Sequence, residues 1–483
     1  MFKLSGWMFV HRVHHVHTVP WQSLLKFSSV RWECALDKKT FAGIRVLPGI
    51  TRLHYCSLYF TTLLIGIAMV MPAVLQPAFL KEVIGVSPDY FGSINSFLSI
   101  ISQVATLALA GVLGVFSDRV GRRPLAVLGF AVTAVFFVLY YHAGPIAAFV
   151  QVPEGISADV CALISFVPGR SSEFYGFAPG LLTVYCLRFG LGVGFVMVLQ
   201  QLVTMAADYS SEDDRGRAMA LNGMMIGIAS AVVFGLAAPF VKNRGVEAAF
   251  YLAAALACTG MLGCLVCLKD HVQARRSAVP RLRDIIPVVR RSPLLQAGYL
   301  CALVTRADVV VASTFITTWG VMLSAEHGFT SEQATARIAL PMVVFTIVSL
   351  LAFPLVGILL DRWGRMPTII ASLLMGGIGM LLLAASSGPF SGWVYAAMVM
   401  VALGMPGTMA GANTLTADGA PPGMVGSVMG GMTTMQPIGI IFFLVAGGYA
   451  FDALGPGWAF GLKGTATLIL GLGLLLTCRR IRK

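Results

Sequence analysis

The sequence predicts an all-α membrane protein with twelve transmembrane helices in two related bundles of six. Hydrophobic residues make up 57% of the 483 positions and charged residues only 11%, which leaves too few polar groups to cover a water-soluble surface of that size. Apolar segments of about 20 residues recur along the chain, and each is long enough to cross a hydrocarbon layer as a helix. A segment of the first half also returns in the second half, which indicates an internal duplication.

The duplication is clearest in a glycine- and arginine-rich motif. Gly114–Pro124 reads G-V-F-S-D-R-V-G-R-R-P, and Gly357–Pro367, 243 residues later, reads G-I-L-L-D-R-W-G-R-M-P. A second set of matches has an offset of 210: Gly194, Asp208, Gly216 and Met219 correspond to Gly404, Asp418, Gly426 and Met429. The offsets differ because the loop 144–177 faces only Ser386–Phe390 in the second half. Repeats of this size in an apolar chain are typical of transporters built from two bundles.

The apolar segments place the twelve helices in order. The expected spans are 57–80, 91–116, 124–142, 179–206, 217–240, 247–268, 294–323, 337–360, 367–387, 391–415, 424–450 and 456–477. They divide the chain into an N-terminal extension (1–50), a first bundle (51–268), a linker (269–293), a second bundle (294–478) and a tail (479–483). We expect the bundles to lie side by side, with any substrate site between them.

Lys and Arg set the expected orientation. The loops on one side of the membrane and the two termini hold 26 of the 34 basic residues. The other side holds Lys81, Arg170, Lys242, Arg244, Arg337 and Lys463. By the positive-inside rule both termini are cytoplasmic, in an inner or plasma membrane. The net charge of +13 follows from loops that face anionic lipid, so we expect no nucleic-acid partner.

Three connecting segments have separate expectations. The extension 1–50 lacks a secretory signal of ordinary form and is expected to be poorly ordered; its cluster of His11, His14, His15 and His17 lacks the fixed geometry of a metal site. The linker residues Ile285, Ile286, Val288 and Val289 are spaced as in a short amphipathic helix at the membrane surface. The loop 144–177 is either a surface insertion or a cap over a cavity.

The repeated motif carries a family resemblance. G-x-x-x-D-R-x-G-R-R-P between the second and third spans, with its copy between the eighth and ninth, resembles the major facilitator superfamily (MFS) of secondary transporters. Arg188–Gly194 in the fourth span resembles the R-x-x-x-G-x-G signature of that family, with Gly192 and Gly194 as helix-packing positions, and Arg215–Ala218 resembles the loop before its fifth helix. The Gly-Pro pair of the family's antiporters is absent from 223–239, which argues against drug/proton exchange.

The resemblance implies that the motif is a latch that joins the two bundles on the cytoplasmic side and helps to hold the outward-open state. Its residues here are Gly114, Asp118, Arg119, Gly121, Arg122 and Arg123, with Gly357, Asp361, Arg362, Gly364 and Arg365 in the second half. Gly114 permits close helix approach, Gly121 permits a tight turn, and Asp118 is suited to a helix N-terminus or a neighbouring Arg. The alternative is that these charges serve only to orient the chain.

Three ionisable residues are assigned to the middle of expected spans: Arg188, Arg306 and Asp308. Intramembrane charges are costly, so each is a functional hypothesis. Arg306 and Asp308 are two residues apart and therefore point to nearly opposite sides of a helix. Asp308 shares its side with Phe315 and Trp319, a stripe expected to line a cavity, and Arg188 is its expected partner in one conformation. A structural ion pair with another helix is the alternative.

The sequence therefore favours a secondary active transporter that moves a small organic molecule by alternating access, coupled to protons through Asp308. The alternatives are a uniporter or importer of an organic anion, motivated by Arg188 and Arg306, and a non-transporting receptor of the same fold. No metalloprotease, nucleophile-elbow or nucleotide-binding motif is present in a suitable context, so we expect neither an enzyme nor a cofactor or metal. The expected partners are a small-molecule substrate, possible coupling protons and the lipid bilayer, with a monomer as the working unit.

Overall fold

The computed structural model describes residues 40–167, 172–211, 214–270, 282–421 and 424–481. Nearly all of this part of the chain is helical, and its one sheet is a two-stranded antiparallel hairpin of β1 (Thr40–Phe41) and β2 (Ile44–Arg45). The His cluster of the extension lies outside the described residues.

The first bundle contains six membrane crossings. Its long helices are α2 (Arg52–Phe79), α3 (Phe91–Val120), α4 (Arg122–Tyr141), α7 (Ser172–Asp208), α8 (Arg215–Val232) and α9 (Ala238–Cys267). The apolar segment from Arg217 to Cys267 is 51 residues long, too long for one crossing at 1.5 Å per residue. Gly245 interrupts it with φ 84° and ψ 169°, so this segment crosses twice and makes the fifth and sixth spans.

The second bundle repeats this plan. Its helices are α11 (Pro293–Thr305), α12 (Ala307–Met322), α13 (Ser331–Arg362), α14 (Arg365–Ala384), α15 (Trp393–Gly419), α16 (Val425–Leu454) and α17 (Gly457–Ile481). We expected one unbroken helix over 294–323, but Arg306 separates α11 from α12, and the two together make a single crossing. With the division at Gly245, the described residues contain twelve crossings, which confirms the predicted fold class.

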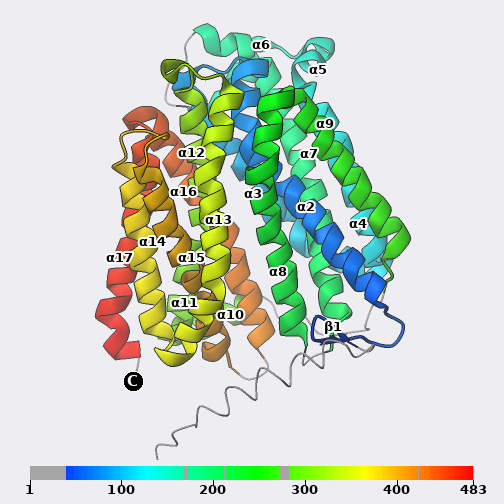
Figure 1. Cartoon of the computed structure of the whole chain (residues 1–483), viewed down its shortest axis with the longest axis vertical. Coiled ribbons are helices and arrows are strands. Elements are labelled where there is room, and N and C mark those ends of the chain that lie inside the picture. Colours follow the sequence, from blue (N-terminus) through cyan, green and yellow to red (C-terminus); the bar gives the residue numbers. More distant parts are fainter. Residues whose placement is uncertain (1–39, 168–171, 212–213, 271–281, 422–423, 482–483) are drawn as a thin grey trace, which may run out of the picture.

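The two ends of the bundle differ. At one end lie α5 (Ala143–Val150) and α6 (Glu154–Ile164), which pack on α7; we call this the α5–α6 face (Figure 1). At the other end lie the β1–β2 hairpin, α10 (Leu282–Arg291) and the end of α17; we call this the linker face. The amphipathic segment predicted in the linker is helical in α10, and Ile285 is buried against Leu295 and Val428.

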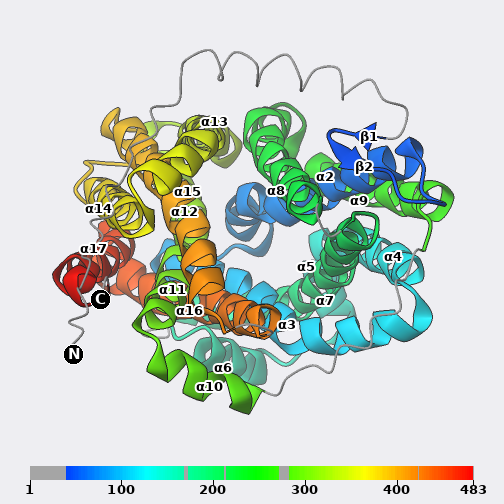
Figure 2. The same ribbon diagram turned by 90° about the horizontal axis from the view of Figure 1, so that it is seen from below.

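The two bundles meet along two seams. Helix α3 of the first bundle packs along α16 of the second, and α13 packs against α8 and α9; both seams are visible from the linker face in Figure 2. The duplicated motif forms the same turn in each half, since Gly121 between α3 and α4 has φ 102° and Gly364 between α13 and α14 has φ 90°. This left-handed region favours glycine, which explains why glycine occupies both copies.

Candidate functional site

A buried ion pair joins two helices of the second bundle. Asp308, in the first turn of α12, pairs with Lys463 of α17, and only 4% and 0% of these residues are exposed. Lys463 Nζ also donates to Thr467 Oγ1 at 2.7 Å and lies 5.0 Å from the ring centroid of Phe443 on α16. One carboxylate and one ammonium are therefore held in an apolar surrounding in which each depends on the other.

This pair corrects one expectation from the sequence and bears on a second. Lys463 was counted among the basic residues on the side opposite the termini, but α17 buries it completely. Arg188 was expected to pair with Asp308 in one conformation; in this structure the partner of Asp308 is Lys463. The sequence could have indicated a buried partner for Asp308, because Lys463 lies within the expected span 456–477 and a charged side chain inside a span needs a partner.

Arg188 stands apart, in the first bundle. Its Nε donates to the carbonyl oxygen of Leu98 on α3 at 3.2 Å, and its guanidinium lies 5.8 Å from the ring centroid of Phe195. Only 5% of Arg188 is exposed, yet its Nη1 has no hydrogen-bond partner among the described residues. Arg188 is thus a buried cation without an ion-pair partner in the described part of the chain.

Arg306 occupies the junction between α11 and α12. Its side chain is exposed, and Nη1 lies 3.0 Å from the sulfur of Met409 on α15. The sequence correctly separated Arg306 from Asp308, since the carboxylate turns to α17 instead.

Phe315 and Trp319 were expected to line a cavity, but the structure packs both into the second bundle. Their exposed fractions are 0% and 6%. Phe315 stacks on Phe451 of α16 at a centroid distance of 5.6 Å. Phe315 and Trp319 each contact the ring of Phe460 of α17. These rings form an aromatic layer between the ion pair and the α5–α6 face.

The same helix α12 holds the bundles together near the α5–α6 face. Asn95 of α3 donates to Thr318 Oγ1 at 2.5 Å, and Ser99 lies 3.4 Å from Thr314 Oγ1. Lys81, in the last turn of the first span, donates to the carbonyl oxygen of Val321 at 3.0 Å and to Ser324 Oγ at 2.9 Å. These bonds close the two bundles against each other on this face.

A carboxylate completes the closure on the neighbouring seam. Asp452, in the last turn of α16, accepts the backbone N–H groups of Gly92 and Ser93 at 2.7 Å each. N–H groups in the first turn of a helix have no acceptor within the helix, and the helix dipole stabilises an anion there, so Asp452 is well placed to accept from α3. The helices approach closely here, because a Cβ on Gly448 would lie 2.2 Å from Ser96 Oγ.

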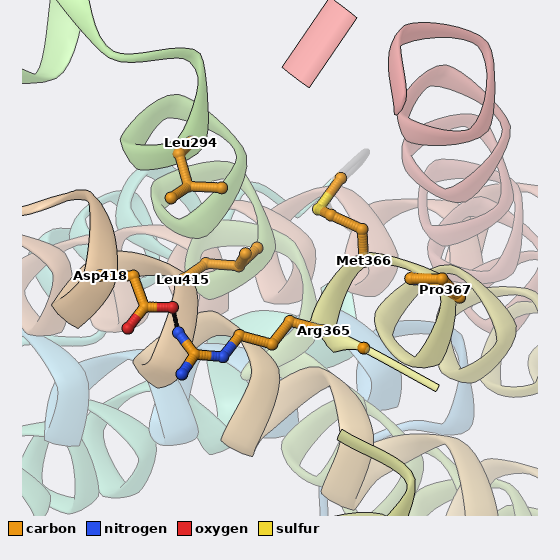
Figure 3. Close-up of a pocket in the computed structure, with 7 residues that line it drawn as sticks. Leu294, Arg365, Met366, Pro367, Leu415 and Asp418 are labelled. Carbon is orange, nitrogen blue, oxygen red and sulfur yellow. Dashed lines mark ion pairs between the residues drawn. The ribbon is translucent and has the colours of Figure 1, made fainter. Parts of the chain in front are cut away.

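On the linker face, both copies of the motif make an equivalent ion pair within their own bundle. Arg122 Nε lies 2.5 Å from Asp208 Oδ2, and Arg365 pairs with Asp418. Figure 3 shows Arg365 reaching Asp418 beside Leu415, in a pocket of about 270 Å³. Arg122 was one of the arginines expected to stabilise Asp118; the side chains of Asp118 and Asp361 lie outside the described residues.

Asp270 also belongs to this network and was not predicted from the sequence. Asp270 Oδ1 accepts the backbone N–H groups of Arg122 and Arg123 at 3.0 and 2.8 Å and so caps the start of α4. Arg123 in turn donates to the carbonyl oxygens of Cys264 and Leu265 at the end of α9. The end of the sixth span is thereby tied to the start of the third. Arg119 and Arg362 are exposed.

The packing glycines differ in what they contact. A Cβ on Gly194 would lie 2.5 Å from Thr133 Oγ1 of α4, and a Cβ on Gly192 would lie 3.2 Å from the Ala105 Cβ of α3, so both helices lie close to α7 at these positions. A Cβ on Gly114 would lie 3.1 Å from the side chain of Gln200. A Cβ on Gly357 would have no atom within 4 Å.

The two bundles, the buried charges between their helices and the closure on one face define a membrane transporter of the two-bundle class. The Major Facilitator Superfamily sequence family matches residues 58–430 and 300–483. The chain therefore belongs to the major facilitator superfamily.

Several known proteins resemble most of this chain. Magnetosome protein MamH of Paramagnetospirillum magneticum is 25% identical over 424 residues, which cover 88% of this chain and 92% of MamH. Magnetosome protein MamZ of Magnetospirillum gryphiswaldense is 28% identical over 82% of this chain, which spans only 58% of MamZ. Multidrug resistance protein 2 of Bacillus subtilis is 21% identical over 85% of this chain and 91% of that protein.

Solved structures show the same fold. A POT family transporter in complex with 5-aminolevulinic acid has a TM-score of 0.65 at 13% identity, covering 93% of this chain and 99% of that one. The nucleoside transporter NupG has a TM-score of 0.60 at 12% identity, covering 87% of this chain and 98% of that one. At such identities the likeness concerns the fold alone.

Proposed function

We propose that this protein is a secondary transporter that moves a small organic solute together with protons by alternating access. The observation that carries the proposal is the buried ion pair of Asp308 and Lys463. Removing two charges from water is costly, and a protein with hydrophobic residues of similar volume in place of a buried ion pair is often equally stable. A pair kept in such a place is therefore a candidate for work that an apolar contact cannot do, such as carrying a proton.

The position of Asp308 relates protonation to the conformation of the bundles. When Asp308 accepts a proton, the attraction to Lys463 is lost, while the ammonium keeps Thr467 Oγ1 and the Phe443 ring as partners. Asp308 lies on α12, the helix whose Thr314 and Thr318 bond to the first bundle near the α5–α6 face. A shift of α12 on protonation would therefore act on that closure directly.

Proteoliposomes that contain a pH-sensitive dye test this proposal. A panel of organic solutes is first screened by thermal shift on the purified protein, since a ligand of the folded state stabilises it. A solute that binds should then drive a pH change inside the vesicles, and an imposed pH gradient should drive its accumulation. Asp308→Asn should abolish both effects, whereas Glu326→Gln, which alters an exposed carboxyl group, should retain them.

The outcomes separate the alternatives. Solute uptake without a pH change would indicate a uniporter. Binding without any flux would indicate a receptor of the same fold. Full proton-driven uptake by Asp308→Asn would show that the ion pair is only structural.

An organic-anion carrier is the second candidate, and Arg188 favours it. A buried guanidinium with one nitrogen unpartnered in the described chain is suited to a carboxylate or phosphate of a substrate. Arg188→Gln should then remove thermal stabilisation by anionic solutes and leave stabilisation by neutral solutes unchanged. Equal losses for both kinds of solute would argue against this candidate.

We further propose that the linker face is cytoplasmic and that the protein acts in a magnetosome membrane. The excess of Lys and Arg on that face supports the orientation, and the similarity to MamH and MamZ supports the compartment. A tagged chain produced in a magnetosome-forming cell should co-purify with isolated magnetosomes. Recovery only in the bulk inner membrane would instead favour an inner or plasma membrane transporter.

A further inference from the structure

A pocket of about 440 Å³ lies on the α5–α6 face, where the two bundles meet along the seam of α9 and α13. Lys242, before the break in α9, lines it from the first bundle. Arg337 and Gln333 of α13, with Phe329 just before that helix, line it from the second bundle. The pocket therefore has walls from both halves of the transporter.

The lining is cationic. No acidic residue lines the pocket, and neither Lys242 nor Arg337 has an ion-pair partner in the described ranges of the chain. The guanidinium carbon of Arg337 lies 3.9 Å from the ring centroid of Phe329, a cation–π contact that holds the group at the mouth. Gln333 Oε1 accepts the N–H of Thr330 at 3.3 Å, so the amide nitrogen of Gln333 remains a donor.

An apolar stripe continues from this pocket along α13. Leu340 lines the pocket and is 56% exposed, and Ile347 and Leu351 follow on the same side of the helix with exposed fractions of 48% and 66%. The stripe runs from the end of the helix toward the middle of the span, where hydrocarbon surrounds the protein. A ligand with an anionic headgroup and apolar chains would match the cationic pocket and the apolar stripe together.

We propose that this pocket binds a phosphate group, supplied by the headgroup of an anionic phospholipid such as phosphatidylglycerol. The phosphate lies between Lys242 and Arg337, and the acyl chains follow Leu340 and Ile347. Two like charges on opposite bundles repel each other, so a phosphate between them favours the contact of the bundles on this face. Charged lipid thereby becomes a regulator of the closure of the transporter.

Titration of the purified full chain with phosphatidylglycerol, phosphatidylcholine or inorganic phosphate, followed by native mass spectrometry and thermal shift, tests the site. Phosphatidylglycerol should bind more tightly than phosphatidylcholine. Lys242→Gln and Arg337→Gln should each weaken that binding about fivefold, the usual effect of one basic residue near an anionic lipid surface. Arg244→Gln is the matched control, because Arg244 is exposed on the same face but does not line the pocket.

The arms of the experiment distinguish the sources of phosphate. Inorganic phosphate that binds with the same dependence on Lys242, while phosphatidylglycerol does not bind, would overturn the lipid and retain the phosphate chemistry. Equal binding of both lipids, or an unchanged affinity in Lys242→Gln, would overturn the proposal. Lys242 is exposed, so the single variant should fold; its gel-filtration profile and circular dichroism confirm this before titration.

Discussion

Arg122 pairs with Asp208 in the first bundle as Arg365 pairs with Asp418 in the second. The two arginines are related by the repeat offset of 243 and the two aspartates by the offset of 210. In each half the pair ties the start of one helix, α4 or α14, to the end of another, α7 or α15. The duplicated sequence thus encodes a duplicated contact, which fixes the motif loop against its own bundle.

The two copies should differ in their contribution to stability. The side chains of Arg122 and Asp208 are 10% and 14% exposed, whereas those of Arg365 and Asp418 are both 42% exposed. Asp208→Asn should therefore be the more destabilising change and lower the free energy of unfolding by about 3 kcal/mol, because it breaks a nearly buried ion pair. Asp418→Asn should cost at most about 1 kcal/mol, since water screens that pair. Urea unfolding in detergent measures both, and equal losses would contradict this reading.

Two carboxylates at the ends of α3 and α16 should have opposite effects on conformation. Asp452→Asn removes a charge from the N-terminus of α3, a contribution of about 0.3 to 2 kcal/mol, and should favour opening of the α5–α6 face. The family resemblance predicts the converse for Asp118→Asn, which should favour opening of the linker face. Distances between spin labels on the two bundles, measured on each face, report both shifts. If both variants opened the same face, the two carboxylates would not have opposite effects on the conformation.

Much of the fold was predictable because its causes are local in the sequence. Apolar length fixed the twelve crossings, and the glycines of the motif fixed the turns at Gly121 and Gly364. The break at Arg306 was not predictable from hydropathy, because α11 and α12 are equally apolar on either side of it.

The candidate site was predictable only in part. Charge in a span correctly selected Asp308 as a buried acid, but the partner depended on which helices become neighbours, and α12 and α17 are separated by 155 positions at the pair. Phe315 and Trp319 share a side with Asp308, as expected. That side faces α16 and α17, not a cavity, which helix periodicity cannot reveal.

The hairpin on the linker face should detach at low pH. The backbone N–H of Arg45, 2.9 Å from Oδ2, and then Ser211 and Arg217 hold the pKa of Asp214 below its usual 3.8. A lowered pKa means that the carboxylate stabilises docking above pH 3.8 and that this contribution is lost as the pH falls through the lower folded-state value. Hydrogen-exchange protection of residues 40–50 should therefore begin to fall as the pH is lowered from 7 to 3 and should fall further below pH 3. In Asp214→Asn the protection of residues 40–50 should be low at both pH values. If protection in this variant still falls with pH, another group is responsible.

The orientation of the chain is open to a direct test. Lys38, the 269–293 linker and Arg480 should all lie in the cytoplasm, because the basic residues concentrate on their side. Single cysteines at these positions, in a chain without its nine native cysteines, should resist an impermeant thiol reagent in intact cells and react after permeabilisation. In a host cell that carries the chain in its plasma membrane, a cysteine at Arg244 should react without permeabilisation. Labelling in the reverse order would invert the topology.

The ion pair of Asp308 and Lys463 predicts strongly non-additive mutants. Asp308→Asn leaves a fully buried ammonium, and Lys463→Met leaves a buried carboxylate, so each should lower the free energy of unfolding by about 3 to 5 kcal/mol. The double variant should lose much less than the sum, because no unpaired charge remains and the Phe443 ring can pack on the Met side chain. Thermal or urea unfolding of the four proteins in one detergent measures the coupling.

The same four proteins separate structure from transport. If the pair carries the coupling proton, the double variant should regain stability but not proton-driven uptake, since no titratable carboxyl group remains at this place. Return of uptake together with stability would show that the pair only holds α12 against α17. Additive losses in stability would show that Asp308 and Lys463 are not partners in the membrane, which would contradict the geometry on which the proposed coupling depends.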